Sequence, residues 1–195
     1  MKIIGLTGGI GTGKSTILNL FKKLGINTYN ADESAKQIIN SDTETIKSVK
    51  NVFGDDIYEN GVLNTNKTSR IVFNNPEKLA LLNSIIHPKV RLDFNKFCEK
   101  NKNDYYVVKE AALIFDTNSE DKYDKIILVT APLEERIKRV MKRDKTTRGK
   151  VLKRIKSQLD HEKLTHKCDF IIDNINEDSL NNFVNEIHYA LIKSI

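Results

Sequence analysis

The residues that could do chemistry are gathered near the start of the chain. Residues 8–15 read Gly-Gly-Ile-Gly-Thr-Gly-Lys-Ser, which is the GxxxxGK[ST] pattern of a phosphate-binding loop, and we call them the phosphate loop. Glycines let the backbone wrap a phosphate with its N–H groups, and a following helix directs its positive end at the same anion. The Lys14 ammonium would reach the β- and γ-phosphates of a nucleotide, while the Ser15 hydroxyl would hold Mg²⁺.

The segments on either side supply the context that this motif requires. Lys2–Leu6 reads as an apolar strand before the loop. An apolar pattern at helical spacing follows and predicts a helix from about Lys14 to Leu24 that stops at Gly25. A glycine-rich turn that binds nothing is therefore the weaker interpretation, and we expect a nucleotide-binding protein.

Asp32 is the candidate for handling the group that receives the phosphate. A short strand is predicted at Ile26–Tyr29, and ligands of open parallel sheets bind at the carboxyl ends of the strands. A carboxylate there could take the proton of an attacking hydroxyl, because phosphoryl transfer needs mainly positioning and charge stabilisation. Alternatively, Asp32 caps a helix that starts at Glu33, and the sequence leaves both interpretations open.

A basic cluster over residues 136–156 is the second candidate. It holds eleven Lys and Arg residues and the single acid Asp144. Three of its members share one helical face: Arg136, Arg139 and Arg143. A lid that carries these arginines and closes on ATP would exclude water and stabilise the transferring charge, with a mobile turn at Thr146–Lys150. A solvated basic surface is the alternative, and nucleic-acid binding is disfavoured because no aromatic residues are interleaved.

Two further polar residues have alternative interpretations. Glu110 ends a predicted strand, where it could belong to the outer shell of Mg²⁺ or be a buried carboxylate without metal. His87 precedes Pro88, and on this pattern a histidine is more often packed or turn-bound than functional. The chain has no Asp-x-x-Gly after the third strand, which argues against a GTPase switch.

Alternating strand and helix signals predict an α/β fold with a mostly parallel sheet and covering helices. Later strands are predicted at Tyr105–Lys109, Lys125–Thr130 and Phe170–Ile172. After Tyr105–Lys109 the apolar signal continues through Leu113–Phe115. Later helices are predicted from about Leu133 and over Ser179–Lys193. The segment 33–103 is too long for a simple crossover. Its helical periodicity predicts a helical insertion with a kink or break near Pro88.

Composition suits one α/β domain with a small insertion. The 195 residues are 39% hydrophobic and 30% charged, and the net charge of +6 suggests an anionic partner. No stretch approaches the roughly 18 apolar residues of a membrane span. Met1 leads directly into the first strand, so we expect no signal peptide and a cytoplasmic protein. Cys98 and Cys168 match no zinc or redox spacing and are expected to be buried apolar residues.

The sequence resembles the dephospho-coenzyme A kinase family along nearly its whole length. The opening GLTGGIGTGKS matches closely. The other matching segments, in chain order, are Ala31-Asp32-x-x-Ala35, Gly61-Val62-Leu63 with Ile71-Val72-Phe73, Leu82-Asn83-x-Ile85-x-His87-Pro88-x-Val90, Arg139-Val140-x-x-Arg143-Asp144 with Arg154-Ile155-x-x-Gln158, and Cys168-Asp169-Phe170-Ile171-Ile172-Asp173-Asn174. Many kinases share the first motif, whereas the His-Pro and lid blocks make the resemblance specific.

The resemblance implies ATP-dependent phosphorylation of the ribose 3′-hydroxyl of dephospho-coenzyme A, the last step of coenzyme A synthesis. It implies one domain over 1–195, a three-layer P-loop fold like that of nucleoside-monophosphate kinases with a five-stranded parallel sheet. Its parts are a core of 1–32, 104–135 and 160–195, a helical acceptor-binding insertion at about 33–103 and a helical lid at about 136–159. Another small acceptor, such as a nucleoside monophosphate or shikimate, is the nearer alternative, and a nucleotide-dependent nucleic-acid-binding protein is the more distant one.

The resemblance also implies roles for single residues. Asp32 would be the catalytic base, while Lys14 and Arg139 would stabilise the transferring phosphoryl group. The residues implied to bind ATP are Gly11, Thr12, Gly13, Lys14, Ser15, Thr16, Arg139 and Asn174. Those implied to bind the acceptor are Thr7, Asp32 and His87, and Ser15 would hold the metal. ATP and Mg²⁺ are the expected cofactors, ATP and dephospho-coenzyme A are the expected partners, and neither nucleic acid nor membrane is expected.

The chain departs from the family pattern at five positions, which are Asn30, Lys36, Asn64, Thr65 and Ala112. Asn30 and Asn64 each stand where the family has an acid. Because Asp32 is intact, the departures concern the fine contacts to the acceptor and leave the expected activity in place.

Overall fold

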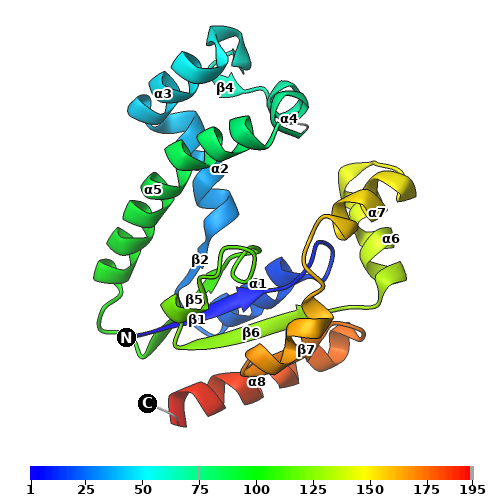
Figure 1. Cartoon of the computed structure of the whole chain (residues 1–195). Coiled ribbons are helices and arrows are strands. Elements are labelled where there is room, and N and C mark those ends of the chain that lie inside the picture. Colours follow the sequence, from blue (N-terminus) through cyan, green and yellow to red (C-terminus); the bar gives the residue numbers. More distant parts are fainter. Residues whose placement is uncertain (74, 194–195) are drawn as a thin grey trace. The chain divides into compact units, whose positions relative to one another are not determined.

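The computed structural model describes residues 1–73 and 75–193 (Figure 1). The chain divides into two compact units, Met1–Tyr29 with Asn101–Ile195, and Asn30–Lys100. We call the first the sheet unit and the second the helical unit, and each is described by itself.

The sheet unit is built on a five-stranded sheet in the order β2-β5-β1-β6-β7. The strands are β1 (Lys2–Thr7), β2 (Thr28–Asn30), β5 (Tyr106–Glu110), β6 (Lys125–Thr130) and β7 (Phe170–Asp173). β1 lies at the centre, where it pairs in parallel with β5 and β6, and β6 pairs in parallel with β7. The predicted five-stranded parallel α/β sheet is confirmed, and each predicted strand lies within about two residues of the observed one.

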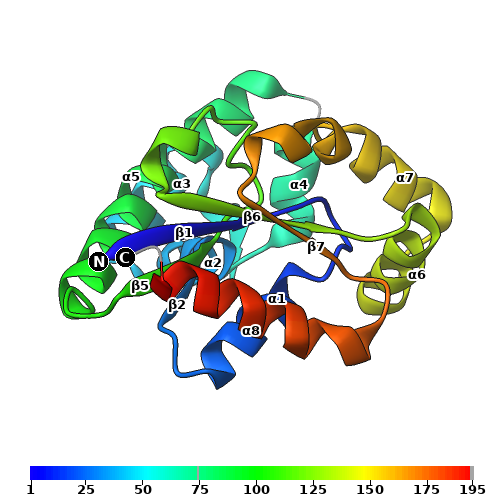
Figure 2. The same ribbon diagram turned by 90° about the horizontal axis from the view of Figure 1, so that it is seen from below.

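The strands read as continuous apolar runs because both faces of the sheet are covered. Helices α1 (Lys14–Lys23) and α8 (Glu177–Lys193) pack together against one face, side by side as Figure 2 shows. The core there includes the fully buried Phe21 and Tyr106. On the other face, Ile114 and Phe115 pack with Ile126. Residues 113–115, which continue the apolar signal of the third strand, lie in turns after β5. Ile114 and Phe115 belong to this second core, whereas Leu113 is exposed.

A helical hairpin follows β6. Its helices are α6 (Leu133–Asp144) and α7 (Arg148–Lys156), and they enclose a separate apolar cluster around Ile137, Val140 and Val151. The predicted turn at Thr146–Lys150 is too long, because α7 already begins at Arg148. The Arg148 guanidinium donates to both carboxylate oxygens of Glu134, at 2.6 and 2.7 Å. Two short 3₁₀ helices, η2 (Glu120–Lys122) and η3 (His161–Lys167), complete this unit.

The helical unit is a bundle closed by a small hairpin. Its elements are α2 (Ala31–Ser41), α3 (Thr43–Phe53), the 3₁₀ helix η1 (Asp55–Ile57), β3 (Tyr58–Glu59), β4 (Val62–Leu63), α4 (Thr65–Phe73) and α5 (Pro76–Lys100). Its core is formed by Ile39, Val49, Ile57, Leu63 and Leu82. β3 and β4 pair antiparallel, and sequence reasoning missed them although Asn60-Gly61, both with positive φ, is a strong hairpin signal.

Of the kink or break predicted near Pro88, only the break is wrong, because α5 continues through the proline. The helix runs through Pro88 as one element, and Figure 1 shows that its direction changes along its length. A proline inside a helix removes one backbone hydrogen bond and costs about 3 kcal/mol. Leu82 and Phe94 are buried on either side of Pro88, and this packing offsets the local cost.

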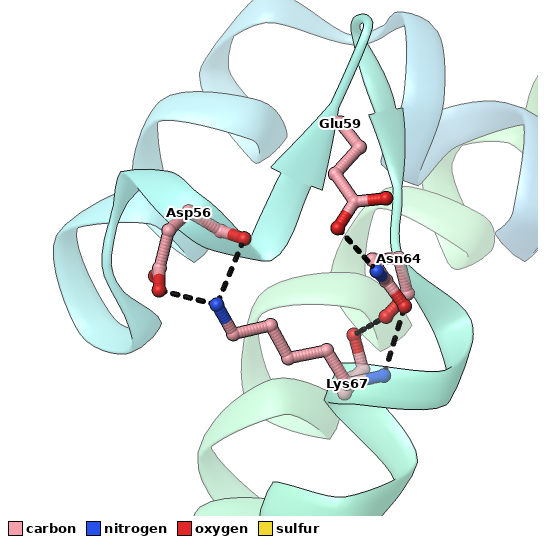
Figure 3. Close-up of polar contacts among 5 residues, drawn as sticks. Asp56, Glu59, Asn64 and Lys67 are labelled. Carbon is pink, nitrogen blue, oxygen red and sulfur yellow. Dashed lines mark hydrogen bonds and ion pairs between the residues drawn. The ribbon is translucent and has the colours of Figure 1, made fainter.

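Asn64, one of the departures from the family pattern, begins a helix (Figure 3). Its side-chain oxygen accepts from the Lys67 N–H at 2.9 Å, and its amide donates to Glu59 Oε1 at 2.6 Å. Lys67 in turn pairs with the Asp56 carboxylate and donates to the Asp56 carbonyl at 3.2 Å. Asparagine and aspartate cap helices about equally well, so this exchange leaves the local fold intact.

Within residues 1–73 and 75–193, no helix is both long and apolar enough to cross a membrane. Cys98 and Cys168 are not joined in a disulfide, and both are half-buried rather than fully buried. Burial, and to a lesser extent Asp169, raises the pKa of the Cys168 thiol to about 11.

Gly25 provides a test of how α1 ends. Its N–H donates to Lys22 O at 3.0 Å, the Ile26 N–H donates to Phe21 O at 3.2 Å, and its φ is 81°. A Cβ at Gly25 meets nothing within 4 Å, so only the backbone conformation opposes a side chain. We expect Gly25→Ala to lower the free energy of unfolding by about 1 kcal/mol, measured by urea denaturation.

Gly149 supplies the matched control for that substitution. It lies in α7, and a Cβ there also meets nothing within 4 Å. Gly149→Ala should raise stability by up to about 1 kcal/mol, because alanine has the higher helix propensity. A shift of the same sign in both variants would contradict the conformational explanation.

Candidate active site

The phosphate loop joins β1 to α1, which confirms the predicted strand–loop–helix context. Gly13 is the N-cap of α1, with φ 94° and ψ 25°, and no side chain caps this helix. A Cβ at Gly13 would overlap the amide nitrogen of Asn174. Both the conformation and the space therefore require glycine here, and the first N–H groups of α1 have no capping side chain, as at helix starts that bind anions.

The first carbonyl groups of the loop are held from within it. Gly8 O and Gly9 O accept from the Lys14 ammonium at 2.8 and 3.3 Å. Gly9 O also accepts from the Thr12 hydroxyl at 2.9 Å. Thr12 is only 2% exposed, so its side chain acts inside the loop.

Later carbonyl groups are held from outside the loop. Ile10 O accepts from Arg136 Nε at 3.0 Å, and Thr12 O accepts from Asn174 Nδ2 at 2.8 Å. In a planar trans peptide, the carbonyl and the next N–H point in opposite directions. With these two carbonyls fixed, the N–H groups of Gly11 and Gly13 point away from Arg136 Nε and Asn174 Nδ2. They lie on the side of the loop where a phosphate can be bound.

Asn174 connects the loop with α6. It is 3% exposed, and its N–H donates to Thr130 O at 2.8 Å, which fixes it at the carboxyl ends of β6 and β7. Arg139 Nη2 donates to the Asn174 carbonyl at 3.1 Å and to its side-chain oxygen at 3.4 Å, and Arg139 Nη1 approaches Thr12 O at 3.5 Å. Asn174, which the resemblance implies to lie near ATP, is thus a buried residue that links the loop to Arg139 by hydrogen bonds.

A pocket of about 320 Å³ lies over the loop. Its lining residues are Gly11, Gly13, Lys14, Ser15, Thr16, Glu110, Arg139, Val140, Arg143 and Asn174. The structure thereby brings together all the residues implied to bind ATP except Thr12, which packs beneath them. Three cationic side chains face one small space, which suits a polyphosphate. The Ser15 hydroxyl and the Glu110 carboxylate, which is buried at the end of β5, are oxygen groups of the kind that Mg²⁺ prefers.

Asp144 holds Arg143 at this pocket and ties α6 to α7. Its carboxylate accepts from Arg143 Nε at 2.7 Å and from Arg154 Nη1 at 2.7 Å. The hydrogen bond from Arg143 is the largest cause that lowers the pKa of Asp144 to about 2. Together with the Arg148–Glu134 pair, Asp144 clamps the hairpin at two places.

Thr7 and Ala112 lie apart from the pocket lining. Thr7 ends β1 and is fully buried, and its hydroxyl approaches Ala112 O at 3.5 Å. The contact uses the main chain of residue 112, so the departure to alanine at that position leaves it in place.

Asp32 and His87 belong to the helical unit. Asn30 is the N-cap of α2, since its Oδ1 accepts from the Glu33 N–H at 2.9 Å, so the alternative that Asp32 caps this helix is wrong. Asp32 is exposed in the first turn of α2.

His87 is exposed on α5, so the packed or turn-bound alternative is also wrong. Of the other departures, Lys36 is exposed on α2 and Thr65 is exposed at the start of α4.

Sequence reasoning gave no role to Gln158 or to the contact of Arg136 with the loop. Both residues line a second pocket, of about 240 Å³, on the side of Gly9 and Thr12. Nothing local in the sequence shows that residues 136 and 158 meet residue 10. Among the described side chains, no group of three or more His, Cys, Asp or Glu residues is placed to hold a metal ion.

Comparisons with known proteins agree with this geometry. A family model described as dephospho-CoA kinase matches residues 2–179. The chain is 39% identical over 174 residues to the dephospho-CoA kinase of Fusobacterium nucleatum, with 88% of this chain and 89% of the relative covered. It is 38% identical over 192 residues to that of Leptospira interrogans, with 97% and 93% covered.

Solved structures extend the likeness to the fold. A Thermus thermophilus protein matches with a TM-score of 0.88 at 29% identity, over 97% of this chain and 96% of that one. The dephospho-CoA kinase of Campylobacter jejuni matches with a TM-score of 0.71 at 26% identity, over 98% of each chain. A shikimate kinase from Acinetobacter baumannii, at 14% identity and a TM-score of 0.51 over 100% of this chain and 94% of that one, shares the fold alone.

The Asp144 clamp should give the hairpin a pH-dependent stability. The pKa of Asp144 lies below the ordinary value of 3.8, so the contribution of Asp144 to stability is present above about pH 4 and is lost as the pH falls toward 2. We expect Asp144→Asn to lower stability by about 1 kcal/mol at pH 7, and the difference from the unaltered protein to shrink below about pH 4. Thermal melts between pH 7 and pH 3 measure this. Asp121→Asn, at an exposed position of η2, is the control, and an equal pH profile in both variants would contradict the clamp.

Proposed function

The chain belongs to the dephospho-CoA kinase family, and from this premise we propose how its residues perform the reaction. The enzyme phosphorylates dephospho-CoA with ATP in coenzyme A biosynthesis. We propose that the ribose 3′-hydroxyl is the group that receives the phosphate and that the enzyme works in the cytoplasm. The observation that carries the proposal is the single pocket in which the phosphate loop meets Arg139 and Asn174.

ATP is proposed to bind with its β-phosphate in the phosphate loop. The N–H groups of Gly11 and Gly13, turned away from the bonded carbonyls, and the amino end of α1 would hold this phosphate. The Lys14 ammonium would exchange the carbonyls of Gly8 and Gly9 for the β- and γ-phosphate oxygens, and Arg139 would lie against the γ-phosphate from α6. Charge stabilisation of this kind is usually the largest catalytic term.

Mg²⁺ is proposed to be held by the Ser15 hydroxyl, with Glu110 in its outer shell. Both groups line the pocket of Lys14, and Glu110 keeps a carboxylate only 8% exposed at the carboxyl end of β5. When bound, the cation would neutralise charge on the β- and γ-phosphates. The residues present fit this ligand set, because hard cations of this kind prefer oxygen donors.

The helical unit is proposed to hold dephospho-CoA, with His87 among its contacts and Thr7 near its reacting end. Asp32 is the proposed base. It follows the end of β2 by two residues, and the carboxyl ends of parallel strands meet at one edge of a sheet. Because Asn30 caps α2, the Asp32 carboxylate is not used to start that helix.

In the proposed step, the 3′-hydroxyl gives its proton to the Asp32 carboxylate as its oxygen bonds to the γ-phosphorus. The bond from that phosphorus to the β–γ bridging oxygen breaks, and ADP leaves with the electron pair. The α6–α7 hairpin is the proposed lid, which would exclude water while Lys14 and Arg139 stabilise the transferring group.

Substrate choice is the first test of the proposal. Mg-ATP is incubated with dephospho-CoA, and in parallel with AMP, CMP and shikimate, while ADP is measured and products are identified by mass and phosphorus NMR. We expect product with dephospho-CoA alone, carrying its new phosphate on the ribose 3′-oxygen. Turnover with AMP or shikimate but not dephospho-CoA would overturn the assignment of the helical unit as the acceptor site.

Asp32→Asn tests the base. Removal of a general base typically costs 10²- to 10⁴-fold in rate, so we expect kcat to fall by at least about 100-fold while the Kd for ATP is unchanged. Glu33→Gln, at the exposed neighbouring carboxylate in the same helical turn, is the matched control and should keep the activity. Turnover of the Asp32→Asn variant at the ordinary rate would remove Asp32 from the mechanism.

A further inference from the structure

Ile10, in the middle of the phosphate loop, is held on both polar sides by side chains far away in the sequence. Its N–H donates to Gln158 Oε1 at 2.8 Å, and its carbonyl accepts from Arg136 Nε at 3.0 Å. Arg136 lies in the first turn of α6, and Gln158 follows the end of α7. Residues at the two ends of the α6–α7 hairpin are therefore hydrogen-bonded to one residue of the loop, Ile10.

The side chain of Ile10 adds a third contact. It packs against the apolar cluster of the hairpin, whose members Ile137, Val140 and Val151 are at most 2% exposed. A Cβ at Gly11 would lie 2.6 Å from the Arg136 carbonyl, so the backbone after Ile10 also approaches α6 closely. The loop is thus anchored to the hairpin by packing as well as by hydrogen bonds.

The bond from Gln158 fixes the orientation of a peptide plane. The peptide between Gly9 and Ile10 has its carbonyl bound to the Thr12 hydroxyl at 2.9 Å and its N–H bound to Gln158. A planar unit held at both polar ends cannot rotate without breaking a bond. The next peptide is held by Arg136, which turns the N–H of Gly11 toward the opposite side, and Gly11 lines the pocket of Lys14.

We propose that Gln158 is a positioning residue for nucleotide binding. Through the Ile10 N–H it holds the loop in the conformation whose amides receive the phosphates, and it couples the loop to the α6–α7 hairpin. It acts on the ligand only through Ile10. This inference rests on the proposed function in taking ATP as the ligand of the loop, and it goes beyond the residues assigned there.

Gln158→Met tests the proposal, because methionine has a similar length and reach but lacks the amide oxygen. Loss of the acceptor leaves the half-buried Ile10 N–H without this bond, which should weaken nucleotide binding by about tenfold. We expect the Kd values for ATP and ADP, measured by calorimetry on the full chain, to rise about tenfold, while that for dephospho-CoA changes less than twofold. Hydrogen exchange of the Ile10 amide should become faster, a readout that a merely structural role would not move selectively.

Gln37→Met is the matched control, since it makes the same chemical change at an exposed position of α2. It should leave the affinity for ATP and the exchange of the Ile10 amide unchanged. If the Gln158→Met variant does not fold, Gln158→Asn tests the same bond, because it keeps an amide but is one methylene too short to reach Ile10.

Two results would overturn the proposal. One is an unchanged affinity for ATP and ADP together with unchanged exchange at Ile10. The other is an equal loss of affinity for nucleotide and dephospho-CoA with a lowered melting temperature, which would reduce Gln158 to a structural role. The proposed function fails separately, through absence of coenzyme A formation by the unaltered enzyme, while weaker nucleotide binding by Gln158→Met would still support the positioning role.

Discussion

The phosphate loop can receive an anion only because its carbonyl groups are bonded elsewhere. Each planar peptide has a donor and an acceptor on opposite sides, so N–H groups converge on one side when carbonyls are held on the other. Thr12 holds the Gly9 carbonyl from within the loop, and Lys14 holds the Gly8 and Gly9 carbonyls in the structure without nucleotide. Arg136 and Asn174 hold them from α6 and from the end of β7. The rest of the sheet unit serves to bring these donors to one place.

The parallel register of the sheet is what places Asn174 there. β1 pairs with β6 so that Thr7 lies opposite Leu128, and β6 pairs with β7 so that Thr130 lies opposite Asp173. The next residue, Asn174, then bonds to Thr130 O through its N–H and reaches Thr12 O with its side chain. A contact across 162 residues of sequence thus follows from two strand pairings and the length of one side chain.

Local signals were enough for the loop, the five strands and the ends of the main helices, because each depends on neighbouring residues. At Pro88 the sequence could not decide between a kink and a break, because packing outweighs the local cost of the proline. At the start of α2 two residues could serve one role, and Asn30 rather than Asp32 caps the helix. The contacts of Ile10 with Arg136 and Gln158 could not be predicted, because they join residues 126 and 148 positions apart. The Asn60-Gly61 hairpin was visible in the sequence and was overlooked.

The salt bridges of the hairpin decide how this arrangement can respond to a ligand. Asp144 and the Arg148–Glu134 pair join α6 to α7, so the two helices would move as one body that carries Arg139 and Arg143 with it. Bending is then confined to the segments that enter and leave the hairpin. Arg136 stands near the first of these and Gln158 in the second, and both bond to Ile10. Displacement of the hairpin must therefore strain the peptide planes of the phosphate loop, so the arginines and the amides that bind phosphate change together.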